Sequence, residues 1–431
     1  MWGQQVNLDK DSESTDFLIE ENKINEFAII GIASTLPFSD DTNELWEILR
    51  IGKECITDFH QSRRKDIDDY LNFLGRSKEK IEYIKGGYLK EIDKFDYKFF
   101  RISPKEAVLM NPAQRIFLQT VYEAIQNAGY GGDKIIGTNT GVYVGYIGDT
   151  EGYKYKQMVS DIDGSANSLS VTGNLPSVLS GRISYLLDLK GPSMTVDLAC
   201  SSSLVAVHMA CQSLKLQDCD MAIVGGICLH FMPLTGEDKL GIESSDGRTR
   251  PFDSESDGTG IGEGSVAILI KPLDKAIRDK DNIHAVIKGS AVNQDGSSAG
   301  LTAPNVLAQA DVISKAIENS GVDPETITYI EAHGTGTKLG DPVEIEGIRR
   351  AFQRYTDKNQ FCAIGSIKAN IGHLYEASGI AGLLKAVLSL KNKVLLPQIN
   401  FKFPNKEINF IDSPVYVNTE LEEWNTEGFP R

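Results

Sequence analysis

Three residues of this sequence, Cys200, His333 and His373, have surroundings that suit nucleophilic chemistry. Cys200 lies in the run Val-Asp-Leu-Ala-Cys-Ser-Ser-Ser-Leu at 196–204, which is typical of a short strand followed by a helix. A thiol over a helix N-terminus lies near the positive end of the helix dipole, and this position favours the nucleophilic thiolate. The serines at 201–203 are residue types that cap a helix. The run predicts a nucleophilic cysteine, and a buried structural cysteine is the alternative.

Two of the six histidines lie in special settings. His333 follows an expected strand at 327–332 and begins the run His-Gly-Thr-Gly-Thr. His373 ends the run Lys-Ala-Asn-Ile-Gly-His and precedes an expected helix. In open α/β sheets, sites are built at the carboxyl ends of the strands. We therefore expect Cys200, His333 and His373 to meet at such an edge.

A cysteine with two histidines suits acyl transfer followed by carbanion chemistry. The thiolate can accept an acyl group as a thioester. Two imidazoles can then hydrogen-bond the thioester oxygen of a second substrate while negative charge develops on it. Metal binding competes with this interpretation, with Glu331 and Asp341 as acidic company, but the spacing matches no zinc signature. We therefore expect no metal.

A second candidate nucleophile, Ser298, stands in the run Gly-Ser-Ser-Ala-Gly at 296–300, which matches the G-x-S-x-G motif of serine hydrolases. That motif needs an apolar strand before it. The preceding residues at 292–295 are Val-Asn-Gln-Asp, so we expect a loop, which argues against a hydrolase. The glycine-rich runs at 258–264 and 334–340 match neither a dinucleotide fingerprint nor a P-loop, and we expect no nucleotide cofactor.

The composition of the 431 residues is that of a globular protein, with 41% hydrophobic and 24% charged residues. The net charge of -16 argues against nucleic acid and anionic membranes as partners. No apolar run is long enough to span a bilayer. The six cysteines form no C-x-x-C pair, so we expect free thiols and a cytoplasmic location.

Strands and helices alternate along the chain, which predicts a layered α/β fold. Residues 1–24 are polar and acidic, and we interpret them as an N-terminal arm or linker. The mixed charges at 63–69 predict a solvated surface. The alternation of strands and helices occurs in two similar series along the chain. These suggest an N-terminal half at 25–272, with the nucleophile, and a C-terminal half at 273–431, with both histidines. Expected buried strands and the main helices fall at 26–33, 113–128, 140–145, 220–226, 265–271, 284–289, 305–320, 327–332, 363–366 and 377–390.

These runs together resemble the ketosynthase domain of modular (type I) polyketide synthases, in the style of trans-acyltransferase assembly lines. The resemblance rests on three catalytic motifs in the family's order: the runs around Cys200, His333 and His373. It extends from residue 25 to the C-terminus. Further matches are Asp-Gly-Arg at 246–248, Gly-Glu-Gly at 262–264, Gly-Leu-Thr-Ala-Pro-Asn at 300–305 and Leu-Gly-Asp-Pro at 339–342.

The resemblance implies a thiolase-like, five-layered αβαβα fold of two related halves, and a homodimer. It implies a β-ketoacyl synthase that performs decarboxylative Claisen condensation in polyketide biosynthesis. Cys200 would take the acyl chain from the phosphopantetheine arm of an acyl carrier protein, with no cofactor bound to the domain itself. His333 and His373 would assist decarboxylation of the malonyl group and stabilise the enolate. Other implied partners are neighbouring polyketide synthase domains and a separate acyltransferase.

Supporting residues also follow from the resemblance. Lys368 and Glu344 match a pair that orders the site. Thr335 and Thr337 match positions that hydrogen-bond the pantetheine arm. Without the resemblance, an exposed ion pair and turn threonines would be the simpler interpretation of these four residues.

Three departures from the family pattern bear on activity. Leu198 stands where the family usually has threonine, and Tyr375-Glu376 replaces the more usual Glu-Ala after the second histidine. The final glycine-rich loop, which in the family supplies a second oxyanion-hole N–H, is missing before Arg431. An alternative function is therefore a non-elongating ketosynthase-like domain that only transfers or holds acyl chains. The two histidines argue against it, because holding a chain requires only the cysteine.

Overall fold

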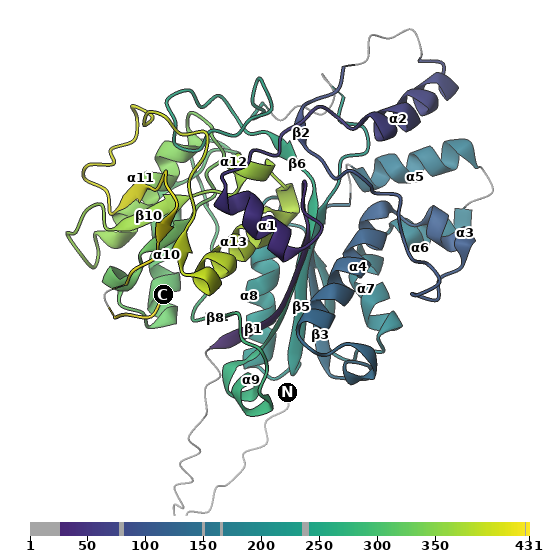
Figure 1. Ribbon diagram of the computed structural model, residues 1–431, viewed down its shortest axis with the longest axis horizontal. Helices are drawn as coiled ribbons and strands as arrows, with labels where there is room; N and C mark the ends of the chain where they lie inside the picture. Colours follow the sequence, from purple (N-terminus) through teal and green to yellow (C-terminus); the bar gives the residue numbers. More distant parts are fainter. Residues whose placement is uncertain (1–25, 77–81, 149–150, 164–166, 235–240, 427) are drawn as a thin grey trace, which may run out of the picture.

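Two β-sheets with helices on their faces build the molecule (Figure 1). The computed structural model describes residues 26–76, 82–148, 151–163, 167–234, 241–426 and 428–431. The N-terminal arm expected at 1–24 lies outside the described residues.

The larger sheet has six strands, in the order β4 (Ser193–Val196), β3 (Thr140–Gly145), β5 (Met221–Cys228), β7 (Gly264–Pro272), β1 (Phe27–Thr35) and β8 (Ala285–Ile287). Every residue of β3, β5 and β7 is buried, as in strands that are covered on both faces. β3 runs parallel to β4 and β5, whereas β7 is antiparallel to β5 and β1. The carboxyl ends of β3, β4 and β5 therefore meet at one edge.

A smaller parallel sheet has β10 (Cys362–Gly365) in the middle, between β9 (Tyr329–Glu331) and β12 (Val415–Val417). Two short pairs lie outside both sheets. They are β2 (Gly86–Gly87) with β6 (Ile261–Gly262) and β11 (Val394–Leu395) with β13 (Glu422–Glu423).

The helices that cover the sheets lie in three layers (Figure 1). Alternate strand residues divide between these layers: Val142 and Val144 pack on the outer side, and Tyr143 packs toward the helices between the sheets. The resulting order is the five-layered αβαβα arrangement of a thiolase-like fold, as expected. From the outer face of the large sheet to the outer face of the small one, the layers hold α4 (Pro112–Asn127) and α7 (Pro176–Leu186), then α8 (Ser202–Lys215) and α13 (Ser378–Asn392), then α10 (Val306–Ser320) and α11 (Gly340–Phe352).

Capping side chains begin two of the shorter helices, α1 (Thr42–Arg50) and α3 (Pro104–Leu109). Asp41 accepts hydrogen bonds from two backbone N–H groups in the first turn of one helix, and Ser103 accepts the N–H of Glu106 in another. Other shorter helices are α2 (Gln61–Phe73), α5 (Glu151–Ile162), α6 (Asn167–Asn174), α9 (Leu273–Asp279) and α12 (Lys368–Ile371).

The solvated surface expected at 63–69 is wrong for Arg63, whose side chain is buried. Its guanidinium makes two bonds to the fully buried carboxylate of Glu263, at 2.6 and 2.8 Å. Glu263 also accepts the backbone N–H groups of Leu89 and His230, both at 2.8 Å. The pair therefore fastens α2 to the residue between β6 and β7.

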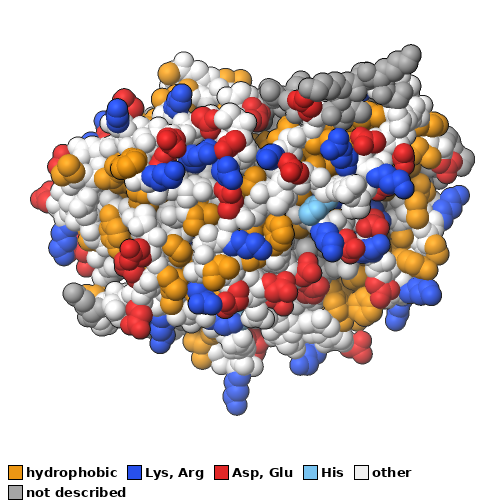
Figure 2. Space-filling view, turned by 45° about the horizontal axis from the view of Figure 1, so that its top comes forward, with side chains coloured by type: hydrophobic (Ala, Val, Ile, Leu, Met, Phe, Trp, Pro, Cys, Tyr) orange, Lys and Arg blue, Asp and Glu red, His pale blue; other side chains and the backbone are white. Residues whose placement is uncertain are grey.

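Acidic and basic side chains are interspersed over the face drawn in Figure 2. This mixture, together with the net charge of -16, gives that face no extended basic patch for nucleic acid. Among the described residues, no helix combines the length and the apolar character needed to cross a bilayer.

The Arg63–Glu263 pair yields a stability prediction. Glu263→Gln leaves the Arg63 guanidinium buried without its counter-charge, which we expect to lower the unfolding free energy by about 3 to 5 kcal/mol. Denaturant titration followed by circular dichroism measures the change. Glu47→Gln is the matched control, since it breaks a solvent-exposed pair with Arg50 and should leave stability unchanged. Equal stability of the two variants would contradict the prediction.

Candidate active site

Cys200 lies in the turn that joins β4 to α8, beyond the carboxyl end of the strand. The preceding residue, Ala199, has a φ of 50°, which is a strained conformation for a residue with a side chain. Ser201 Oγ donates to the Leu198 carbonyl at 2.7 Å, and Ser202 Oγ donates to the Ala199 carbonyl at 2.6 Å. The expected serine cap of α8 is wrong, because these hydroxyls bond backward and stabilise the turn instead.

The thiol of Cys200 is half-buried, whereas the other five cysteines are buried. Burial raises the pKa of Cys200, and the nearby ammonium of Lys368 works in the opposite direction. The net shift is opposite to the one expected from the helix dipole, because desolvation penalises the thiolate more than its surroundings stabilise it. Cys200 is therefore an accessible thiol at rest, held beside one buried cation.

The peptide group of His333 is held on both sides by charged side chains. The Glu344 carboxylate accepts the N–H of His333 at 2.6 Å and the N–H of Gly334 at 2.8 Å. Lys368 Nζ, which is buried, donates to the His333 carbonyl at 2.6 Å. Burial raises the pKa of Glu344 and lowers that of Lys368, while their opposite charges counter both shifts. The predicted pair thus contacts the backbone of His333 and is not the exposed ion pair of the simpler interpretation.

His373 has one fixed neutral tautomer. Its Nδ1 accepts the backbone N–H of Tyr375 at 2.8 Å and is 2.7 Å from the Ser378 hydroxyl. A backbone N–H can only donate, so Nδ1 carries no hydrogen and the hydrogen lies on Nε2. Burial, with the charge of Lys368 next in weight, lowers the pKa of His373 well below its ordinary value. Nε2 is buried and has no hydrogen-bond partner in the described part of the chain, so its N–H is free for a ligand.

The backbone on both sides of this ring is tied to β6. The N–H of His373 donates to the Gly260 carbonyl at 2.7 Å, and the N–H of Gly262 donates to the His373 carbonyl at 2.9 Å. Gly372 has a φ of 77°, and a Cβ there would lie 2.3 Å from the Ile261 carbonyl oxygen. Only glycine fits this crossing, which places His373 at its position.

The structure brings together the three residues that the sequence singled out. Sγ of Cys200 and one ring nitrogen each of His333 and His373 lie within 4.8 Å of one another. The two imidazole rings are nearly perpendicular, at 88°, with their centroids 5.6 Å apart. Surrounding protein atoms and, next, the Lys368 charge lower the pKa of His333, although the residue is exposed to solvent. The site therefore presents one thiol and two neutral imidazoles.

A spacing of this kind could also suit a metal ion, so the donor atoms matter. A metal ligand must offer a free lone pair, whereas Nε2 of His373 carries a hydrogen as long as Tyr375 donates to Nδ1. The two acidic residues considered as further metal ligands, Glu331 and Asp341, bind other groups. Glu331 accepts from Lys385 at 2.8 Å and from the N–H of Ile367, while Asp341 accepts the backbone N–H groups of Phe252 and Gly336. The arrangement fits a hydrogen-bond donor at His373 better than a metal ligand.

Thr335 and Thr337 lie in the turn between His333 and α11. Their hydroxyl oxygens are 3.2 Å apart, and Thr337 Oγ1 accepts the N–H of Gly340 at 3.1 Å. Gly334, with a φ of 46°, lets this turn pass the side chain of Ser366. The two threonines therefore occupy the segment that leads away from His333.

Tyr375 and Glu376 were singled out in the sequence only as departures from the family pattern. The Tyr375 ring stacks on His373 at 4.9 Å and meets the edge of His230 at 5.6 Å. Tyr375 has a φ of 40°, another strained backbone beside the site. Glu376 is buried, and burial raises the pKa of its carboxyl to about 8. Nothing in residue type or spacing predicts these environments, because they arise from packing around His373.

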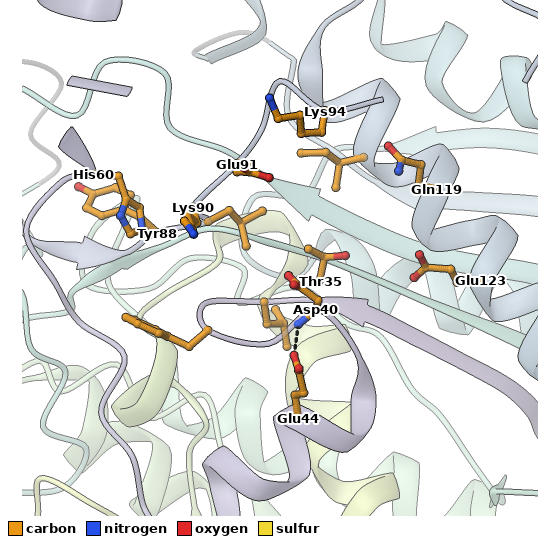
Figure 3. Close-up of a pocket in the computed structure, with 14 residues that line it drawn as sticks. Thr35, Asp40, Glu44, His60, Tyr88, Lys90, Glu91, Lys94, Gln119 and Glu123 are labelled. Carbon is orange, nitrogen blue, oxygen red and sulfur yellow. Dashed lines mark hydrogen bonds between the residues drawn. The ribbon is translucent and has the colours of Figure 1, made fainter. Parts of the chain in front are cut away.

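A cavity of about 480 Å³ opens elsewhere, among β1, α1, α4 and the segment at 88–94 (Figure 3). Its lining mixes acids, two lysines and apolar residues, and it includes none of Cys200, His333 and His373. In Figure 3, the Glu44 carboxylate accepts the backbone N–H of Asp40 in the lining of this cavity. The cavity therefore adds no group to the site described above.

Comparison with known proteins agrees with this geometry. Residues 25–276 match the family described as "Beta-ketoacyl synthase, N-terminal domain", and residues 284–402 match "Beta-ketoacyl synthase, C-terminal domain". Polyketide synthase PksL of Bacillus subtilis (strain 168) is 45% identical over 420 residues, which cover 94% of this chain and 9% of that protein. Polyketide synthase PksM of the same organism is 42% identical, with 94% and 10% covered. The chain thus spans about a tenth of these curated relatives.

Solved structures resemble the fold at similar identity. The ketosynthase from module 6 of the bacillaene synthase from Bacillus subtilis 168 superposes with a TM-score of 0.82 and 40% identity, covering 93% of this chain and 67% of that one. The ketosynthase from module 1 of the bacillaene synthase from Bacillus amyloliquefaciens FZB42 gives a TM-score of 0.83 and 38% identity, with 94% and 71% covered.

The electrostatic link between Lys368 and Cys200 can be tested by alkylation. Lys368→Met removes the cation that lowers the pKa of Cys200, so the midpoint of its alkylation by iodoacetamide should move to higher pH. Below that midpoint, we expect the rate to fall roughly threefold to tenfold. Rates are read from intact mass across a pH series, and Cys200→Ala identifies the labelled residue. Lys315→Met, at an exposed position of α10, is the control, and a K368M profile equal to it would refute the link.

Proposed function

Because the chain belongs to the β-ketoacyl synthase family, we propose that it performs the decarboxylative Claisen condensation of polyketide biosynthesis, with Cys200 as the acyl-carrying nucleophile. The supporting observation is the placement of Cys200, His333 and His373 within 4.8 Å of one another, with the Nε2–H of His373 free. A thiol beside two neutral hydrogen-bonding rings meets the needs of acyl transfer and of enolate stabilisation.

The first step loads the acyl chain. The Cys200 sulfur, as thiolate, attacks the thioester carbonyl of an acyl chain carried on the phosphopantetheine arm of an acyl carrier protein. A carbon–sulfur bond to Cys200 forms, and the bond to the pantetheine sulfur breaks, so that the carrier leaves as a thiol with the proton that Cys200 gave up. Lys368 favours the thiolate that starts this step. The backbone N–H of Cys200 serves as one oxyanion donor.

The second step extends the chain. Loss of CO₂ from a malonyl group on the acyl carrier protein leaves the electron pair of the broken C–C bond on an enolate. His373 donates from Nε2 to the enolate oxygen, and His333 is the second donor. The enolate carbon then attacks the Cys200 thioester, and the thiolate of Cys200 leaves. The product is a β-ketoacyl chain, two carbons longer, on the carrier.

Supporting roles follow from the contacts. Lys368 and Glu344 position His333 by holding its carbonyl and its N–H. We assign the pantetheine arm to the hydroxyls of Thr335 and Thr337, which border the turn after His333. No cofactor is assigned to the domain itself, since the reacting groups arrive on the carrier.

A homodimer is part of the proposal. β4 is an edge strand of the large sheet, and exposed strand edges are surfaces at which a second chain can pair. Large apolar side chains are exposed around it: Met194 at 39%, Leu198 at 50% and Tyr185 at 84%.

Other proposed partners are the acyl carrier protein, neighbouring polyketide synthase domains and a separate acyltransferase. The six free cysteines support a reducing, cytoplasmic location.

The acyl-carrying role of Cys200 has a direct test. With an acyl N-acetylcysteamine thioester, the wild-type chain should gain the mass of one acyl group, and Cys200→Ala should gain none. Intact mass spectrometry measures both. Ser298→Ala is the matched control, because it removes the rival nucleophile and should leave acylation unchanged. Acylation that survives in C200A would overturn the proposal.

The condensing role of His373 separates elongation from mere acyl transfer. His373→Ala should still be acylated at Cys200 but should form ketide from malonyl-acyl carrier protein roughly a hundredfold to a thousandfold more slowly, since a donor to the enolate is lost. His373→Gln, which retains an N–H donor, should recover part of the rate. His208→Gln, on α8 and bonded to Ser290, is the control. If acylated wild-type protein forms no ketide, the transferring or holding function is favoured instead.

A further inference from the structure

Glu376 places its carboxyl at the meeting point of three parallel strands. Its Oε1 accepts the N–H of Ile147, just after β3, at a long 3.5 Å. The thiol of Cys228, the last residue of β5, also hydrogen-bonds the carboxyl, and the charge of Asp197, just after β4, acts on it. Sheets of this type bind ligands beyond the carboxyl ends of such strands. The carboxyl therefore lies where a ligand is expected in such a sheet.

Glu376 differs from Glu263 and Glu331 in having no cation beside it. Glu263 pairs with Arg63 at 2.6 Å, and Glu331 pairs with Lys385 at 2.8 Å. Glu376 is only 6% exposed, yet no lysine, arginine or histidine nitrogen of the described residues lies within ion-pair distance of it. A buried carboxylate without a counter-charge is costly, so the neutral acid is the stable form.

The neutral acid has an O–H that can donate a hydrogen bond. Burial raises the pKa of Glu376 to about 8, which keeps the acid protonated at neutral pH. Its close contacts are backbone N–H groups, which only donate, and a thiol, which is a weak acceptor. We infer that this O–H can be given to an oxygen atom of a bound molecule.

The carboxyl is also electrostatically close to the nucleophile. A charge on Glu376 raises the pKa of Cys200, and it raises the pKa of the adjacent Tyr375 as well. Tyr375 in turn stacks on His373. Glu376 is therefore the next residue in the chain after one that contacts a proposed catalytic histidine. A chain bonded to Cys200 and directed toward the ends of β3 and β5 would pass this carboxyl.

We propose that Glu376 is a specificity-determining residue, whose carboxylic acid donates a hydrogen bond to a hydroxyl or carbonyl oxygen on the acyl chain held by Cys200. The inference rests on the proposed function, because it requires an acyl chain on that cysteine. It predicts that oxygenated chains are accepted better than saturated chains of equal length.

A matched set of thioesters tests this selectivity. Hexanoyl, 3-hydroxyhexanoyl, 3-oxohexanoyl and 5-hydroxyhexanoyl N-acetylcysteamine are offered separately, and the rate of Cys200 acylation is measured by intact mass. For the wild type, we expect one or more oxygenated chains to react roughly fivefold to tenfold faster than hexanoyl. Glu376→Ala should lose that preference, whereas Glu376→Gln, whose amide also donates, should keep most of it. Glu318→Gln, on the exposed side of α10, should behave as wild type.

The pH dependence gives an independent readout. As pH rises through about 8, Glu376 ionises and loses its donor, so the wild-type preference should fade, while that of E376Q should not. The titratable groups around this carboxyl are Asp197, Cys200, Cys228 and Tyr375. Comparing two thioesters at each pH cancels the effect of Cys200 ionisation on the rate.

The outcomes separate the two proposals. If no thioester acylates Cys200, the proposed function fails. If all four thioesters acylate it at equal rates, or if E376A keeps the wild-type preference, the function stands and the role of Glu376 is overturned. Thermal unfolding of E376A checks that the variant is folded, and E376Q preserves the test if E376A is not.

Discussion

The chemistry of the site depends on one hydrogen bond, from the backbone N–H of Tyr375 to Nδ1 of His373 at 2.8 Å. This bond removes the choice of tautomer, since the donor cannot reverse its role. It places a hydrogen on Nε2, keeps the ring neutral and takes away the lone pair that a metal would need. The same ring in the other tautomer would offer an acceptor where the proposed enolate needs a donor. A single backbone geometry therefore decides which reactions this cluster of residues can support.

That geometry is maintained by contacts that reach far along the chain. Tyr375 holds a φ of 40° while its ring lies between His373 and His230. The backbone of His230 is held on one side by Glu263, which accepts its N–H, and on the other by Arg63, which donates to its carbonyl at 2.8 Å. A salt bridge between α2 and the segment before β7 thus supports the wall of the site. The burial of the Arg63–Glu263 pair suits this role, because a mobile pair at the surface could not hold the His230 ring against Tyr375.

The sequence predicted the layers of this fold well, because its strands are continuous apolar runs and helices such as α4 and α10 carry an apolar face and a capping asparagine. It also singled out Cys200, His333 and His373, which stand in distinctive runs at strand ends and which the structure brings together. It failed for Arg63 and for the serines after Cys200. The mixed charge at 63–69 gives no indication of a partner two hundred residues away at Glu263. A serine whose hydroxyl donates to a preceding carbonyl cannot be distinguished, by residue type, from a serine that caps a helix. The tautomer of His373 and the burial of Glu376 depend on packing, which residue types alone do not specify.

The absence of a strongly ionised nucleophile is consistent with the rest of the site. Burial raises the pKa of Cys200 and lowers those of His333 and His373, so the reacting groups are neutral at rest. Lys368 supplies the nearby positive charge, and its Nζ is fixed on the His333 carbonyl. In the proposed reaction, one fixed cation beside these neutral groups would stabilise transient negative charge, first on the thiolate and then on the enolate. A permanently charged imidazole would bind anions at rest, so the low histidine pKa values and the buried lysine belong to one electrostatic arrangement.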